Sequence, residues 1–232
     1  MRNADAAPKC TIIAIDGPAA SGKSSTAHWV AQRLGYVHVD SGGLYRAATA
    51  VQLRRNPVAE EWTEDEVLDG VRAIGLSTTG STVTPTIDGH PAVEQLRTSD
   101  VTRHVSRVAK MLRVREWVNQ QVRLAARDHN VVVDGRDMGT AVFPGADLKV
   151  FLVADAWERA RRRLIQRLER RPTDDEIAEE TDLIAHRDAR DAVQTARADD
   201  AVLIDTTYIT QEEQVDRIVA LAKAAVRRRE VG

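Results

Sequence analysis

Short apolar runs alternate along this chain with longer segments in which apolar residues recur every three or four positions. The runs lie at 11–15, 37–39, 131–133, 148–153 and 202–205, and each has the length of a buried strand. Short buried strands that alternate with helices are typical of a parallel sheet with helices on both faces. The pattern therefore predicts an α/β fold in which helices sandwich such a sheet.

Helical spacing and capping residues predict the helices between these runs. They lie at 22–34 and 41–55, at about 63–74, from Ser99 to beyond Val118, from Asp155 to Pro172, and from Thr173 and Thr210 onward. The helices at Thr63, Thr173 and Thr210 each begin with a capping box, a threonine followed three residues later by a glutamate. Residues 76–90 break the pattern, because threonine and valine alternate there with turn residues. We expect small hairpins at this point, inserted on the main sheet.

Charge and composition exclude several classes of function. A net charge of −2 over 232 residues offers no electrostatic attraction for nucleic acid or anionic lipid. The single cysteine, Cys10, excludes an internal disulfide or a cysteine-based metal cluster. Residues 1–10 lack the apolar stretch of a signal peptide, and no apolar run approaches the roughly 18 residues of a membrane span. We expect a soluble, cytoplasmic protein with no nucleic-acid or membrane partner.

The segment GPAASGKS, residues 17–24, fits the pattern G-x-x-x-x-G-K-[ST], with a predicted strand before it and a helix after it. Such a loop aims backbone N–H groups at phosphates, and the helix N-terminus adds roughly half a positive charge. Lys23 would reach the β- and γ-phosphates, and the Ser24 hydroxyl would ligate Mg²⁺. The loop predicts a nucleoside triphosphate site made of Gly17, Pro18, Ala19, Ala20, Ser21, Gly22, Lys23, Ser24 and Ser25.

Several classes of protein use such a loop. A GTPase switch would carry an Asn-Lys-x-Asp motif that reads guanine, and this sequence has none. Motor and remodelling ATPases are usually larger or carry oligomeric elements. A chain of this size, with many arginines and an inserted segment, instead suits phosphoryl transfer to a small acceptor.

Two further segments offer candidate acceptor residues. In VDSGGLYRAA, residues 39–48, Ser41, Tyr45 and Arg46 could bind an acceptor phosphate. The alternative is that Ser41 is only a helix N-cap and Tyr45 only a core residue. In SRVAKMLRVRE, residues 106–116, Ser106 and Arg115 are nine positions apart. They are too far apart to share a helix face unless the helix bends between them.

VVVDGRDMGT, residues 131–140, combines a buried strand with charged residues at its end. Asp134 is well placed to order Mg²⁺-bound water, and Arg136 could bridge donor and acceptor phosphates. Asp137 is left to face the substrate. A tight Asp-Gly turn is the alternative reading, but a turn needs neither the arginine nor the second aspartate.

Several motifs together resemble the signatures of bacterial cytidylate kinases, in the same order and over most of the chain: IDGPAASGKSSTA, VDSGGLYR, VTRHVSRVAKMLRVRE, VVDGRDMGTAVFPGADLKVFL and DDAVLIDTT. The resemblance implies a P-loop NTPase fold and MgATP-dependent phosphorylation of CMP and dCMP. It further implies a single nucleoside monophosphate kinase domain over 1–232, with a nucleotide-binding insert at about 62–106 and a short lid at about 168–186. We expect a monomer.

The resemblance places Ser106, Arg115 and Asp137 on the cytosine. Cytosine offers an amino donor that suits an aspartate acceptor, and its N3 and O2 acceptors suit an arginine. A uracil carbonyl would oppose Asp137, and losing a buried pairing of this kind costs about 1–3 kcal/mol. The remaining roles are also implied by the resemblance: Arg46 and Arg136 on the CMP phosphate, Asp191 on the ribose, Arg159 and Arg163 near the adenine and lid, and Lys23, Arg136 and Arg187 in catalysis.

The chain departs from the family pattern within residues 187–201. Gln194 stands where the family has a second phosphate-binding arginine, and the Pro-Leu segment that follows in the family is missing. Arg190 or Arg197 could supply this charge, and Leu112 stands where the family often has proline. Two other hypotheses stay open: a related kinase for another or a modified pyrimidine nucleotide, and a degenerate homologue that binds nucleotide without turnover.

Overall fold

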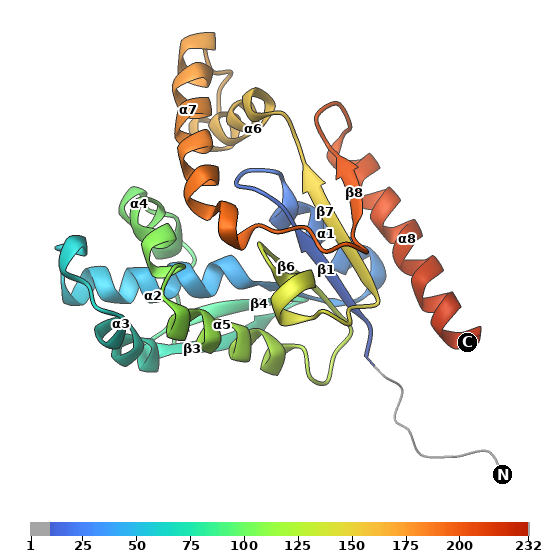
Figure 1. Ribbon diagram of the computed structural model, residues 1–232, viewed down its shortest axis with the longest axis horizontal. Coiled ribbons are helices and arrows are strands. Elements are labelled where there is room, and N and C mark those ends of the chain that lie inside the picture. The colour runs from blue at the N-terminus through green and yellow to red at the C-terminus, as the bar shows by residue number, and fades with distance from the viewer. Residues whose placement is uncertain (1–9, 232) are drawn as a thin grey trace.

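One mixed sheet of eight strands forms the centre of the computed structural model, which describes residues 10–231 and, for residues 230 and 231, the backbone alone (Figure 1). The expectation that the chain begins without a signal peptide rests mainly on residues 1–9, which lie outside this range. The strands are β1 Ile12–Asp16, β2 Val37–Asp40, β3 Ile74–Thr79, β4 Thr82–Ile87, β5 His90–Pro91, β6 Val131–Gly135, β7 Leu148–Val153 and β8 Val202–Asp205. The α-helices are α1 Lys23–Leu34, α2 Ser41–Arg55, α3 Glu64–Gly70, α4 Ser99–Val108, α5 Leu112–Ala125, α6 Ala156–Leu168, α7 Asp174–Asp191 and α8 Gln211–Val231.

The strand order confirms the predicted parallel sheet. Along the sheet it runs β3-β4-β2-β6-β1-β7-β8, and every pair from β4 to β8 is parallel. The hairpin predicted at 76–90 is β3 and β4, which pair antiparallel. This hairpin extends the central sheet, because β4 pairs with β2 through His38–Thr82 and Val39–Val83.

The side chains of each central strand alternate between two cores, one on each face of the sheet. On β1, Ile13 and Ile15 pack with residues of α1 and α8. Ala14 packs on the opposite face with residues of α2, α4 and α5. Figure 1 shows α8 on one side of the sheet and α2 and α5 on the other. Because both faces are covered, the carboxyl ends of the strands are left to carry the polar residues.

The capping boxes at Thr63 and Thr173 are present in full, and Thr210 and Glu213 exchange the same two hydrogen bonds. The predicted extent of the first helix was wrong: α3 ends at Gly70, and Ile74 already begins β3. The polypeptide between them forms a 3₁₀ turn, 71–73.

The continuous helix predicted from Ser99 was also wrong. α4 ends at Val108 and α5 begins at Leu112, with Met111 in an extended conformation between them. Val108, Met111 and Val114 all pack into one apolar cluster. The interruption therefore keeps the apolar spacing that suggested one helix, while it changes the direction of the chain.

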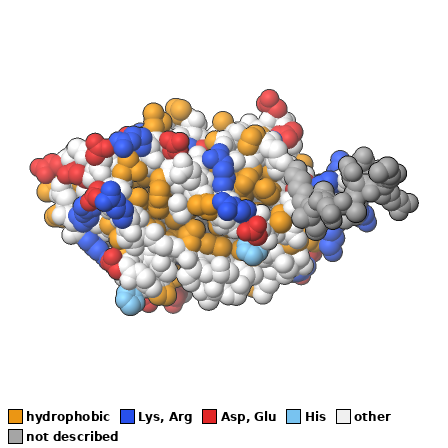
Figure 2. All heavy atoms as spheres, turned by 90° about the horizontal axis from the view of Figure 1, so that it is seen from below, with side chains coloured by type: hydrophobic (Ala, Val, Ile, Leu, Met, Phe, Trp, Pro, Cys, Tyr) orange, Lys and Arg blue, Asp and Glu red, His pale blue; other side chains and the backbone are white. Residues whose placement is uncertain are grey.

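No helix within residues 10–231 is long and apolar enough to cross a membrane. The face of the molecule drawn in Figure 2 carries basic and acidic side chains interspersed among apolar ones.

Candidate active site

The phosphate loop lies between β1 and α1, in the predicted strand–loop–helix context. Gly22 caps α1 with a φ of 84°, a left-handed conformation that favours glycine. Gly17 lies so close to β7 that a Cβ atom there would overlap the carbonyl oxygen of Leu152. The Lys23 ammonium donates to the carbonyl oxygen of Pro18 at 3.1 Å, which folds this side chain back across the loop.

Helices α6 and α7 hold the tip of this loop. The backbone N–H of Ala19 donates to Asp188 Oδ1 at 3.1 Å, and Arg159 Nη1 donates to the Ala19 carbonyl at 2.8 Å. Arg159 and Asp188 also pair with each other at 2.6 Å. Arg159, predicted near the adenine, thus has its guanidinium on the loop backbone in this structure. Asp188 was not among the predicted site residues, because nothing in its local sequence indicates a partner 169 positions away.

Ser24 and Asp134, the two residues predicted on the magnesium side, come together. The Ser24 hydroxyl donates to Asp134 Oδ2, and His38 Nε2 lies 2.7 Å from Asp134 Oδ1. A hydroxyl and a carboxylate oxygen are ligands that Mg²⁺ prefers, and Mg²⁺ in kinase sites usually takes few protein ligands besides waters and phosphates. The donor set therefore fits the ion. His38 was missed, although the alternation in β2 places it on the same face as Asp40.

Several cationic side chains converge opposite the loop. Arg136 donates to the Gly17 carbonyl at 2.7 Å and to Asp191 Oδ2 at 3.0 Å. Arg187 Nε lies 3.6 Å from the same Asp191 oxygen. Burial, followed by repulsion from Arg136, lowers the pKa of Lys23 to about 7 and that of Arg187 to about 10. Such crowding of positive charge is the arrangement that an anionic ligand relieves.

Arg115 and Asp137, both predicted on the base, form an ion pair. Arg115 Nη1 also donates to the carbonyl of Ala109 at 3.1 Å, within the interruption between α4 and α5. Ser106 is buried near the end of α4. The bend that a shared site for Ser106 and Arg115 requires is therefore present.

The structure bears on the two alternative readings of α2, in which Ser41 is only a helix N-cap and Tyr45 is only a core residue. The N-cap of α2 is Asp40, and the Ser41 hydroxyl donates to the backbone carbonyl of Asp134 at 2.8 Å, so the N-cap reading of Ser41 was wrong. Tyr45 is 7% exposed and its ring packs in the core, so only its hydroxyl is left to contact a substrate. Within residues 10–231 its hydroxyl has no hydrogen-bond partner. Burial raises the pKa of Tyr45 to about 12, which keeps this hydroxyl a donor.

The other predicted residues have structural partners. Arg46 donates to the Leu96 carbonyl at 3.1 Å and to Thr102 Oγ1 at 3.0 Å, and burial lowers its pKa. Arg163 Nε lies 3.2 Å from Glu180, a buried carboxylate of α7. Arg46 is thus held beside α4, and Arg163 is held against α7.

Asp16, the last residue of β1, supports the turn that carries Asp137. It accepts hydrogen bonds from the N–H groups of Met138 and Gly139, both at 2.8 Å. Burial raises the pKa of Asp16 to about 6. The sequence indicated only a turn at Asp16-Gly17, and its partners come from a segment more than 120 residues away.

Comparison with known proteins gives a consistent result. The family model described as cytidylate kinase matches residues 13–224. A cytidylate kinase of Salinibacter ruber is 40% identical over 221 residues, 92% of this chain and 97% of its own length. A cytidylate kinase of Limosilactobacillus fermentum is 38% identical over 211 residues, 89% of this chain and 92% of its own length.

Among solved structures, an uncharacterized protein of Eubacterium ventriosum superimposes with a TM-score of 0.51. The alignment covers 92% of this chain and 98% of that protein at 12% identity, which supports the α/β fold alone. The family match spans the phosphate loop, the Arg115–Asp137 pair and the arginines of α7. This chain belongs to the cytidylate kinase family.

Proposed function

We propose that this protein transfers the γ-phosphate of MgATP to CMP or dCMP, giving CDP or dCDP. The observation that carries the proposal is the position of Arg136. It contacts the phosphate loop at Gly17 and helix α7 at Asp191. Its guanidinium therefore lies where a donor triphosphate on the loop would meet an acceptor phosphate.

On the donor side, the loop N–H groups and Lys23 bind the triphosphate. Ser24 and Asp134 would hold Mg²⁺, and His38 fixes the carboxylate of Asp134 by its 2.7 Å contact. When bound, the ion neutralises charge on the phosphates and orients them. Arg159 acts by holding the tip of the loop at the Ala19 carbonyl. Arg163 contacts Glu180, which belongs to the lid.

On the acceptor side, Asp137 accepts a hydrogen bond from the cytosine amino group. Arg115 and Ser106 donate hydrogen bonds to the ring acceptors of cytosine. Arg115 is already held by Asp137, so the recognising groups are oriented before the nucleotide arrives. Asp191 binds the ribose. Ser41, Tyr45 and Arg46 bind the acceptor phosphate together with Arg136.

The chemical step needs no general base, because the acceptor phosphate oxygen is already an anion near neutral pH. Catalysis is alignment of the two phosphates and stabilisation of charge on the transferring group. Lys23, Arg136 and Arg187 supply that charge. The lid at about 168–186 closes over the phosphates and excludes water, while residues 62–106 form the insert that binds the acceptor.

A coupled assay of ADP formation tests the function. The purified protein is given MgATP with CMP, dCMP, UMP or AMP in turn. We expect rapid turnover with CMP and dCMP and much slower turnover with the other two. Preference for UMP or AMP would refute the cytosine assignment, and no turnover on any acceptor would favour a protein that binds nucleotide without transfer.

A further inference from the structure

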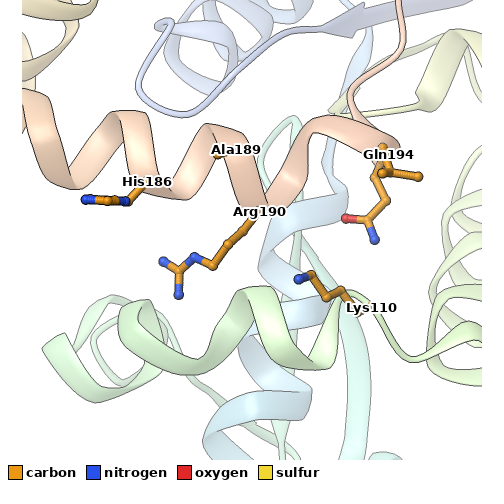
Figure 3. Close-up of a pocket in the computed structure, with 6 residues that line it drawn as sticks. Lys110, His186, Ala189, Arg190 and Gln194 are labelled. Atoms are coloured by element: carbon orange, nitrogen blue, oxygen red, sulfur yellow. The ribbon is translucent and has the colours of Figure 1, made fainter.

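A cavity of about 810 Å³ opens between helix α7 and the turn that joins α4 to α5. Lys110 contributes to it from the turn, and His186, Arg190 and Gln194 contribute from α7 and the 3₁₀ turn that follows (Figure 3). In the close-up the side chains of Lys110 and Arg190 extend into the space between the two segments. Sites for small molecules commonly occupy about 300–1,000 Å³, so the cavity is large enough for a nucleotide.

The cavity carries positive charge that the protein does not neutralise. None of its six lining residues is acidic. Within residues 10–231, neither Lys110 nor Arg190 forms an ion pair or a side-chain hydrogen bond, whereas Arg115, Arg136 and Arg159 are all paired with aspartates. Two cations that face one space without a carboxylate favour an anionic ligand.

Both walls of the cavity continue directly into the candidate active site. Lys110 follows Ala109, whose carbonyl accepts from Arg115. Arg190 precedes Asp191, which pairs with Arg136. The phosphate is the only anionic group of a nucleoside monophosphate, so a nucleotide held between these walls would turn this group toward the two cations.

We propose that Lys110 and Arg190 bind the phosphate of the acceptor nucleotide from opposite walls of this cavity, where Gln194 carries no charge. The proposal rests on the proposed function. It assigns the compensating charge to Arg190, which lines the cavity, rather than to Arg197, which does not, and it adds Lys110, which the sequence did not indicate. Both residues determine affinity for the phosphorylated acceptor and leave recognition of the base to Arg115 and Asp137.

The test compares the affinities of the full-length variants Lys110→Met and Arg190→Met for CMP and for cytidine, by calorimetry. Each variant removes one charge at an exposed position, and we expect CMP affinity to fall about five- to tenfold. Cytidine lacks the phosphate, so its affinity should stay within about twofold. In the coupled assay KM for CMP should rise while kcat changes little, as expected when binding is lost equally from ground and transition states.

The matched control is Lys223→Met, on an exposed position of α8, which should bind both ligands as the wild type does. If both cavity variants keep wild-type CMP affinity, or lose cytidine affinity to the same extent, this proposal is wrong while the kinase function stands. A loss of CMP affinity in Arg197→Met but not in Arg190→Met would overturn it as well. A wild-type protein that binds and phosphorylates no cytidylate would overturn the proposed function and this inference together.

Discussion

The surroundings of Lys23 lower the pKa of its ammonium group, so that this side chain is partly neutral near pH 7. Burial, together with repulsion from Arg136 and Arg187, lowers its pKa to about 7. A bound triphosphate would place several negative charges beside the ammonium and raise this pKa again. At pH 8 the free protein carries a largely neutral Lys23, and the complex carries a charged one.

We therefore predict that ATP binding at pH 8 is accompanied by uptake of up to about one proton. The measurement is calorimetry in buffers with different ionisation enthalpies. Lys23→Arg should abolish the uptake, because arginine stays charged throughout this range. Equal proton uptake in the wild type and this variant would assign the titration to another group.

We expect Arg187 to act on the transferring phosphate rather than in acceptor binding. It lies 3.6 Å from Asp191 and, within the described residues, its Nε makes no hydrogen bond, which leaves the group available to a developing charge. Arg187→Ala should lower kcat by about a thousandfold or more, as loss of an arginine finger does. Affinity for CMP should change far less. Single-turnover kinetics with calorimetry separates the two, and an unchanged kcat would refute the assigned role.

Asp137 is the residue that should separate cytosine from uracil. As a carboxylate paired with Arg115 it only accepts, whereas an asparagine amide can also donate to a uracil carbonyl. Asp137→Asn should reduce the ratio of kcat/KM for CMP over UMP by about ten- to hundredfold, from the exchange of a buried pairing. Asp137→Ala is the control, since it should weaken CMP without improving UMP. If the asparagine variant keeps the wild-type ratio, the base is read elsewhere.

At the scale of elements, α7 connects the two halves of the site. Arg187 lies four positions and Asp188 three positions before Asp191, so both are neighbours of Asp191 on one side of the helix. Asp188 contacts the loop tip and Arg159, and Asp191 contacts Arg136. A movement of this helix would therefore act on donor and acceptor residues together.

Asp188→Asn should loosen the loop and leave the buried guanidinium of Arg159 without its charged partner. We expect the free energy of unfolding to fall by about 1–3 kcal/mol and KM for ATP to rise by about tenfold. Urea unfolding and steady-state kinetics measure the two effects. Asp182→Asn, an exposed position on the same helix, should change neither. A variant with wild-type stability and KM would show that the loop tip does not depend on this contact.

Patterns of neighbouring residues predicted most strands and helix starts correctly. They did not indicate which residues contact each other across long stretches of sequence. The five apolar runs became strands and the capping boxes became helix starts, because both patterns are properties of neighbouring residues. The interruption at 109–111 was missed because the apolar spacing continues across it into the same cluster. The pairing of β4 with β2 also depends on residues more than 40 positions apart.

The candidate site follows the same division. Lys23, Arg136 and Asp137 lie inside recognisable motifs and were predicted. His38, Asp188 and Asp16 act through partners on other elements, and their sequence neighbourhoods did not identify those partners. Lys110 became a candidate only when the fold placed it beside α7.

At the scale of the molecule, the fold brings cations from α1, α2, α6, α7 and the segment after β6 to the carboxyl ends of the parallel strands. The chain carries a net charge of −2, so this concentration of positive charge is local. Burial and mutual repulsion depress the pKa values of Lys23, Arg46 and Arg187 there. This crowding of charge therefore lowers the free energy of unfolding of the ligand-free protein, and a bound polyanion would offset that loss.

The crowding of cations has a measurable effect on thermal stability. A polyphosphate that binds the folded site should stabilise the protein by about 2.7 kcal/mol at a hundredfold excess over its Kd, which for a chain of this size raises Tm by about 5–10 °C. Differential scanning calorimetry with inorganic tripolyphosphate, against sodium chloride of equal ionic strength, measures the effect. Arg187→Met should raise Tm without ligand, because one crowded charge is gone, and should reduce the rise on adding tripolyphosphate. A lower ligand-free Tm in this variant would show that Asp191 outweighs the repulsion among the cations.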